Sequence, residues 1–98
     1  MLAEVKLYLR VDGNFEDELI SSLIAAAEAY IKSASGKTRT ADGKPLADNE
    51  LYKTAVKMLV SHWYDNRGTE YVGKTVSKIG NSFNLILGHI TISEDFIP

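Results

Sequence analysis

The sequence predicts an all-α fold, a small bundle of two long antiparallel helices with a short N-terminal helix and a short C-terminal helix. Two observations support this class. Apolar residues recur with the 3.6-residue period of a helix in residues 15–35 and 49–67, and a glycine follows each segment where helices commonly end. At this length, residues 1–98 are expected to form a single domain.

A short helix is expected at residues 2–10, followed by a turn at residues 11–14. Gly13 favours the turn because glycine adopts a positive φ without steric cost. The side chains expected to face inward from the helix are Leu2, Val5, Leu7 and Leu9.

The second helix is expected to follow Asn14, a good N-cap, and to end at Ser35 before Gly36. Acidic side chains in its first turn suit the positive end of the helix dipole. Its expected buried face comprises Leu19, Ile20, Leu23, Ile24, Ala27, Tyr30 and Ile31.

Residues 37–47 show no apolar period and contain Asp42-Gly43 and Pro45, which predicts an exposed loop. Asp48 is the expected N-cap of the third helix, which ends at Gly68. The apolar face of this helix comprises Leu51, Tyr52, Ala55, Val56, Leu59, Val60 and Trp63.

Beyond Gly68 the sequence leaves alternatives open. Residues 69–81 are polar and fit either a small hairpin at 70–77 or a loose loop. Residues 82–90 fit a last short helix, or instead a strand that continues through residues 91–92, and Gly88 and the β-branched residues at 90–92 count against the helix. We favour the helix because of its single apolar face, which comprises Phe83, Ile86, Leu87 and Ile90.

Composition excludes several classes of protein. The chain has no cysteine, so disulfide frameworks and thiolate sites are ruled out. No apolar run approaches the roughly 20 residues of a membrane span, and the charged N-terminus is unlike a signal peptide, so a soluble intracellular protein is expected. A net charge of −2 is too small for a general polyelectrolyte binder of DNA.

No arrangement typical of catalysis or metal binding is found. A zinc site needs three or four ligands, and only His62 and Asp65 share one helix, with His89 in another element. Ser61 and His62 cannot form a triad with Asp65, because adjacent helical side chains point about 100° apart. We therefore expect no enzyme, no metal and no cofactor.

Charge is unevenly distributed along the chain. Residues 1–31 carry six acidic and two basic side chains, whereas residues 32–44 carry four basic and one acidic. These segments are either solvated surfaces or complementary surfaces of adjacent copies. Tyr64 and Arg67 lie off the core stripe and are of types enriched at interface hot spots. The candidate protomer-interface residues are Glu16, Asp17, Glu18, Lys37, Arg39, Lys44, Tyr64 and Arg67.

The order of these features resembles the head–tail connector (head-completion adaptor) family of tailed bacteriophages and prophages. The resemblance covers residues 1–67 and rests on LAEVKLYLRVD, on EDELISSLIAAAEAYI followed later by SGK, and on the helix ending HWYDNR. Residues 68–98 depart from the C-terminal pattern of that family.

The resemblance implies a structural virion protein that forms a ring of about twelve copies, which can require the portal for assembly. The ring would extend the DNA channel between the portal protein and a tail-side completion protein. DNA would pass through without specific reading, and no membrane would be contacted. The protein would be found in the virion and, during assembly, in the host cytoplasm.

Two alternatives to the connector remain. The first is a small DNA-binding or DNA-packaging accessory module that uses the basic 37–44 loop, which salt-dependent binding to duplex DNA would reveal. The second is a prophage-encoded scaffold or toxin-like interaction protein with an unrelated partner.

Overall fold

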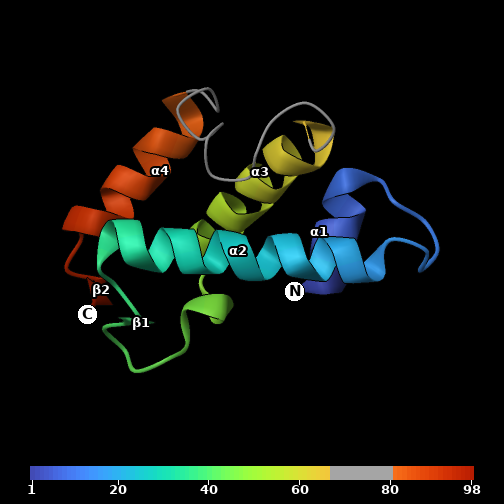
Figure 1. Ribbon diagram of the computed structural model, residues 1–98. Coiled ribbons are helices and arrows are strands. Elements are labelled where there is room, and N and C mark those ends of the chain that lie inside the picture. Colours follow the sequence, from blue (N-terminus) through green and yellow to red (C-terminus); the bar gives the residue numbers. More distant parts are fainter. Residues whose placement is uncertain (67–80) are drawn as a thin grey trace.

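Four helices account for most of the described chain, which comprises residues 1–66 and 81–98 of the computed structural model (Figure 1). Between α2 and α3 lies a 3-10 turn, η1, and the chain ends in a short strand. The elements are α1 (Leu2–Leu9), α2 (Asp17–Ser35), β1 (Arg39–Thr40), η1 (Leu46–Asp48), α3 (Glu50–Asn66), α4 (Asn81–Ile92) and β2 (Phe96–Ile97). The predicted all-α fold is confirmed.

α2 and α3 form the antiparallel centre of the bundle. The Tyr52 hydroxyl, near the start of α3, donates a hydrogen bond of 3.0 Å to Glu28 Oε1 in the second half of α2. Near the end of α3, the Tyr64 hydroxyl donates to Glu16 Oε1, just before α2 begins. Because the order of the contacts is reversed, the two helices run in opposite directions, as predicted.

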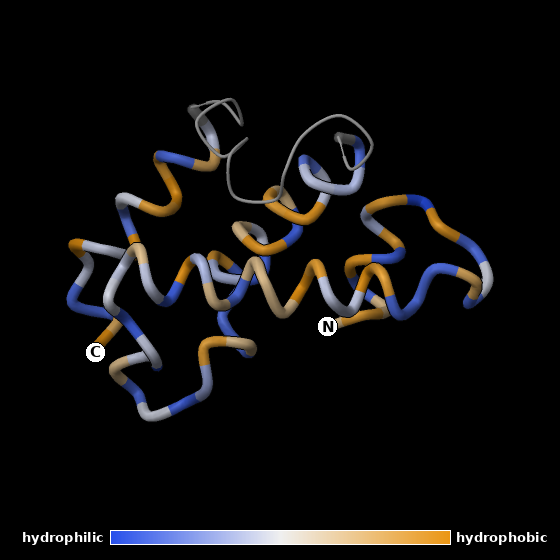
Figure 2. The backbone as a smooth tube through the Cα atoms, viewed as in Figure 1, coloured by the Kyte–Doolittle hydropathy of each residue, from blue (hydrophilic) through white to orange (hydrophobic). Residues whose placement is uncertain are grey.

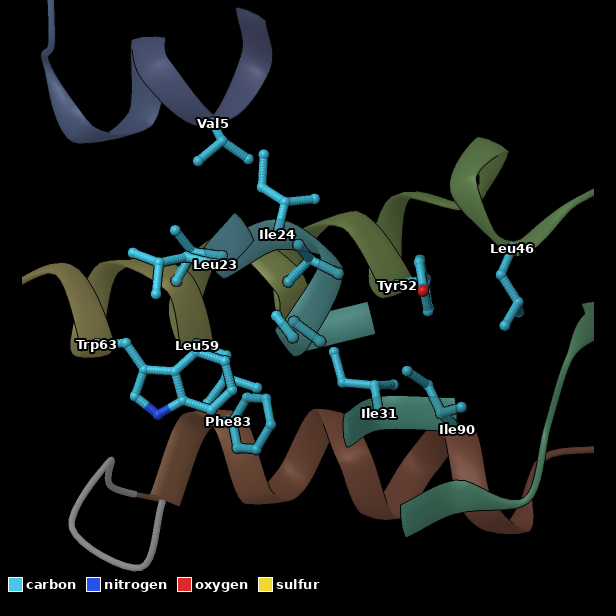
Figure 3. Close-up of a cluster of buried hydrophobic side chains, with 14 of the residues drawn as sticks. Val5, Leu23, Ile24, Ile31, Leu46, Tyr52, Leu59, Trp63, Phe83 and Ile90 are labelled. Carbon is cyan, nitrogen blue, oxygen red and sulfur yellow. The ribbon is translucent and has the colours of Figure 1, made fainter. Parts of the chain in front are cut away.

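All four helices contribute to one hydrophobic core, in which Val5 from α1 and Phe83 from α4 are fully buried with the apolar faces of α2 and α3 (Figure 3). Figure 2 shows hydrophobic positions alternating with hydrophilic ones along α2. None of the described helices combines the length and apolar character needed to cross a membrane. Six of the residues predicted for the apolar face of α3 are buried, namely Tyr52, Ala55, Val56, Leu59, Val60 and Trp63.

Three predicted core residues are exposed instead. Leu7 is 81% exposed because it lies about 200° around α1 from the buried Val5, and so short a helix presents only one face to the bundle. Leu19 and Leu51 lie in the first turns of α2 and α3, where the apolar stripe reaches the edge of the core. The prediction of these three positions as buried was wrong.

Two predicted N-caps are displaced along the chain. α2 begins at Asp17 after Glu16, and Asn14 contributes only its backbone oxygen, which accepts from the Asp17 N–H at 3.3 Å. Asn49, not Asp48, caps α3, since its Oδ1 accepts the Tyr52 N–H at 3.0 Å. Asp48 is already the last residue of η1 and is not free to take that position.

The helix end predicted at Gly36 is confirmed. Gly36 has φ 73°, in the left-handed region, and its N–H donates to the Lys32 carbonyl oxygen. The end of α3 predicted at Gly68 and the hairpin considered at 70–77 lie outside the described residues. α4 confirms the helix preferred for residues 82–90 and extends two residues further, to Ile92.

The prediction of an entirely exposed loop at 37–47 was wrong in part. β1 pairs antiparallel with β2, with Arg39 opposite Ile97 and Thr40 opposite Phe96. Phe96, Leu46 and Thr40 are all buried. The C-terminal residues therefore fix the backbone of the basic segment against the bundle.

Candidate assembly surfaces

The predicted acidic and basic interface residues lie at opposite ends of α2 (Figure 1). Glu16, Asp17 and Glu18 stand at its start, and the basic 37–44 segment follows its last residue. Because α2 has 19 residues, the two groups are separated by a helix about 28 Å long. They cannot pair within one copy of the chain.

Glu16 and Tyr64, both predicted interface residues, bind each other within the chain. Both side chains are half-buried at the end of the bundle where α2 begins and α3 closes. The Glu16 carboxylate makes no cap hydrogen bond to the first turn of α2, and its Oε1 accepts from the Tyr64 hydroxyl. The pair therefore joins α2 to α3.

Asp17 forms an ion pair with a residue of α1. Its Oδ1 lies 2.8 Å from the Lys6 ammonium, although the direction of approach is not that of a hydrogen bond. Glu18 differs from its neighbours, since it is exposed and has no partner among residues 1–66 and 81–98. Of the three acidic residues, Glu18 is the one presented to solvent for contact with another molecule.

The basic side chains of the 37–44 segment also differ in exposure. Lys37 is half-buried, and its Nζ donates to the Phe96 carbonyl oxygen at 3.1 Å, which holds the C-terminal strand in place. Arg39 and Lys44 are exposed. Arg39 and Lys44 are therefore the basic side chains of this segment that another molecule can contact.

A hydrogen-bonded turn presents Lys44. Asp42 Oδ1 accepts the backbone N–H of Lys44 at 3.1 Å and is also bonded by the Thr40 hydroxyl. The Thr40 hydroxyl also lies 2.8 Å from the Lys44 carbonyl oxygen. Because a hydroxyl carries one proton, Thr40 shares that proton between the two acceptors or donates it to each in turn. The Thr40 hydroxyl first, and then the Lys44 N–H, hold the pKa of Asp42 below its ordinary value.

No metal centre is formed in the described ranges, where no three histidine, aspartate or glutamate side chains gather in a way that could hold an ion. His62 is half-buried on α3 and has an interaction partner, and His89 is exposed on α4. Arg67, the remaining predicted interface residue, lies outside the described residues.

Sequence reasoning also missed three large apolar side chains that are exposed. Phe15 is fully exposed in the turn between α1 and α2, and Leu85 and Ile92 on α4 are 74% and 82% exposed. Phe15 precedes α2, which begins at Asp17, and was not assigned to the expected buried face of that helix. Leu85 and Ile92 are seven residues apart, two helical turns, and share a face of α4 that does not contain Phe83.

Comparison with known proteins identifies a family. A family model described as phage gp6-like head-tail connector protein matches residues 1–90. The match confirms the family resemblance seen in residues 1–67 and extends it through most of α4. No curated protein and no solved structure matches the chain.

Proposed function

This chain belongs to the family of phage gp6-like head-tail connector proteins, structural virion components that link head and tail, and we propose that its copies form a ring adaptor on the capsid portal. The ring extends the DNA channel from the portal toward a tail-side completion protein. Copies assemble on the portal, which serves as their template.

One observation carries the ring proposal, namely the placement of unlike surfaces at opposite ends of one rigid helix. A ring requires a heterologous interface, in which one surface of a copy docks on a different surface of the next. The acidic start of α2 and the basic segment that follows it provide such a pair. Since they lie about 28 Å apart in a single copy, each remains available to a neighbour.

The exposed charges define the proposed contact more narrowly than the sequence did. Glu18 of one copy approaches Arg39 and Lys44 of the next. Glu16 and Asp17 hold the surrounding helices in position through their own intrachain partners. Exposed ion pairs contribute about 0–1 kcal/mol each, so these contacts set the direction of docking and apolar contacts supply most of the affinity.

DNA passes through the proposed channel without specific reading. A net charge of −2 supports this, because a strongly basic lining would retain the duplex electrostatically. Around the basic segment, Asp42 and Asp95 further reduce the positive potential. Salt-dependent binding of the isolated chain to duplex DNA would instead support a DNA-binding accessory module.

The test of the ring adaptor is a mixture of the purified chain with its cognate portal protein. We expect the two to co-elute in gel filtration and negative-stain electron microscopy to show an added ring coaxial with the portal. A chain that remains separate from the portal at micromolar concentration would contradict the proposal.

A further inference from the structure

The basic 37–44 segment lacks the apolar side chains that would hold it in one conformation. Its sequence, KTRTADGK, contains alanine as its only apolar residue, and among the described residues 37–44 only Thr40 is buried. The bonds of Asp42 to Thr40 and Lys44 shape the turn within the segment but do not attach it to the bundle. Since so little burial cannot offset the entropy lost when a backbone is fixed, its order depends on residues 93–98, which we call the C-terminal segment.

The C-terminal segment attaches the basic segment to the bundle (Figure 1). The backbone N–H of Thr38 donates to the Ile97 carbonyl oxygen at 2.9 Å, and that of Ala41 donates to the Asp95 carbonyl oxygen at 2.7 Å. Phe96 lies between these two acceptors, is 1% exposed and belongs to the hydrophobic core. The basic segment is therefore anchored by an aromatic ring that a distant part of the chain supplies.

The strand pairing also decides which side chains face outward. Consecutive side chains of a strand point to opposite faces, whereas opposed residues of an antiparallel pair share a face. Thr40 lies opposite Phe96 and both are buried, so Arg39 lies on the other face, where it is exposed. A shift of the pairing by one residue would turn Arg39 inward. The C-terminal segment therefore sets the orientation of a side chain that is proposed to contact the next copy.

Lys37 completes this attachment. Its Nζ donates to the Phe96 carbonyl oxygen at 3.1 Å, and its side chain is half-buried, unlike that of the exposed Lys44. Its backbone is held as well, because the buried Ser35, the last residue of α2, accepts the Lys37 N–H on its Oγ at 3.2 Å. Lys37 is thus joined both to the end of α2 and to the C-terminal segment.

We propose that the C-terminal segment positions Arg39 and Lys44 for docking, and that Lys37 acts on assembly through its bond to Phe96 and not through a carboxylate of the neighbouring copy. This inference rests on the proposed ring, for which it identifies the positioning residues. Exposed ion pairs are too weak to offset the entropy of ordering a free segment, so they favour docking only where the segment is already ordered. The C-terminal segment lies beyond residue 90, where the family match ends, so membership of the family does not imply this role.

Amide hydrogen exchange in the isolated chain tests the ordering. Phe96→Ala is expected to speed exchange of the Thr38 and Ala41 N–H groups by about tenfold or more, because both lose their acceptors when the strand opens. Lys37→Met, which removes no core side chain, should speed the same exchange by about threefold. Asp95→Asn is the matched control, since the Asp95 contact uses the backbone oxygen and should persist. Unchanged exchange in Phe96→Ala and Lys37→Met would overturn the inference.

Assembly on the cognate portal, measured as the chain concentration that half-saturates the portal, tests the role of Lys37. Lys37→Met is expected to raise this concentration by about threefold or more, and Lys37→Arg, which keeps a donor, should restore it. In a chain that ends at Ile92, Lys37→Met should have no further effect, because the bond that it removes is already absent. An equal effect of Lys37→Met with and without the C-terminal segment would indicate a direct contact with the neighbour and overturn the inference. Should the shortened chain lose its helices in circular dichroism, the exchange of Lys37→Met decides.

The outcomes separate this inference from the proposed function. Rings that form equally well from Lys37→Met, although its Thr38 and Ala41 amides exchange faster, would overturn the positioning role and leave the ring adaptor in place. Failure of the unmodified chain to form rings would contradict the adaptor and the role in assembly with it. The exchange measurement would still decide whether the C-terminal segment orders residues 37–44.

Discussion

The Tyr64 hydroxyl donates a hydrogen bond to the Glu16 carboxylate, 48 positions earlier in the chain. The bond joins the end of α3 to the residue before α2 and fixes the end of the bundle that presents Glu18. Tyr64 and Glu16 therefore act on assembly through the shape of the protomer, and their loss should first appear in the stability of the single chain.

Replacement of Tyr64 by phenylalanine removes this bond and keeps the ring. We expect the free energy of unfolding, measured by urea denaturation of the isolated chain, to fall by about 1 kcal/mol. Tyr8→Phe is the matched control, because Tyr8 is exposed and its hydroxyl has no partner in the described ranges. Equal stabilities for the two variants would contradict the intrachain role of Tyr64.

Replacement of Gly36 and of Gly88 by alanine should change the stability of the protein in opposite directions. Gly36 ends α2 with φ 73°, a conformation that costs an L-residue about 1 kcal/mol, so Gly36→Ala is expected to destabilise the protein. Gly88 is helical within α4, and an added Cβ would meet no atom within 4 Å. Gly88→Ala is therefore expected to stabilise the protein by about 0.5–1 kcal/mol, which thermal unfolding of both variants checks.

The hydrogen bonds of the turn that presents Lys44 should be detectable as a lowered pKa of Asp42. Its folded pKa lies below the ordinary 3.8 because the carboxylate accepts from the Thr40 hydroxyl and the Lys44 N–H. The stabilisation is therefore fully present above pH 3.8 and is lost as pH falls through the folded pKa. Thr40→Val should raise the pKa of Asp42 toward 3.8 in an NMR titration, whereas Thr38→Val, at an exposed position, should leave it unchanged.

Tyr52 should resist ionisation in the folded protein. Burial first, and then the charge of Glu28 beside it, raise its pKa well above the ordinary value of 10.0. Its contribution to stability is complete below pH 10.0 and declines as pH rises further, because the unfolded chain then releases a proton that the folded chain retains. Tyr52→Phe should make alkaline unfolding less steep. Phenolate absorbance from Tyr52 before the fold opens would refute this.

Reversal of exposed charges tests the polarity of assembly. Arg39→Glu should weaken ring formation on the portal, and Glu18→Lys in the same chain should restore part of it. Each exposed ion pair contributes about 0–1 kcal/mol to the free energy of assembly. Arg10→Glu is the control, since it changes the net charge equally at the acidic end. Equal weakening by Arg39→Glu and Arg10→Glu would indicate a general charge effect and no specific pairing.

Local periodicity predicted most of the helical fold. The face from Tyr52 to Trp63 and the end of α2 at Gly36 follow from spacing and from glycine chemistry alone. The cap of α3 was not decided by the sequence, because Asp48 and Asn49 are both good caps and only η1, which uses Asp48, selects between them. The β1–β2 pairing escaped prediction because two-residue strands have no period and their partners lie 56 or more positions apart.

The candidate surfaces were predicted in outline and corrected in detail. Segregation of acidic and basic residues was visible in the sequence, and α2 places the two groups at opposite ends. Sequence spacing could not reveal that Asp17 meets Lys6 or that Lys37 meets Phe96, since both are tertiary contacts. The exposure of Phe15, Leu85 and Ile92 likewise depends on which sides of the helices the core occupies.

Cryo-electron microscopy of the chain bound to its cognate portal examines the head-to-tail ring most directly. We expect one ring coaxial with the portal, in which Glu18 of each copy lies near Arg39 of the next. A ring in which Glu18 and Arg39 face no neighbouring copy, or copies joined through identical surfaces, would contradict this arrangement.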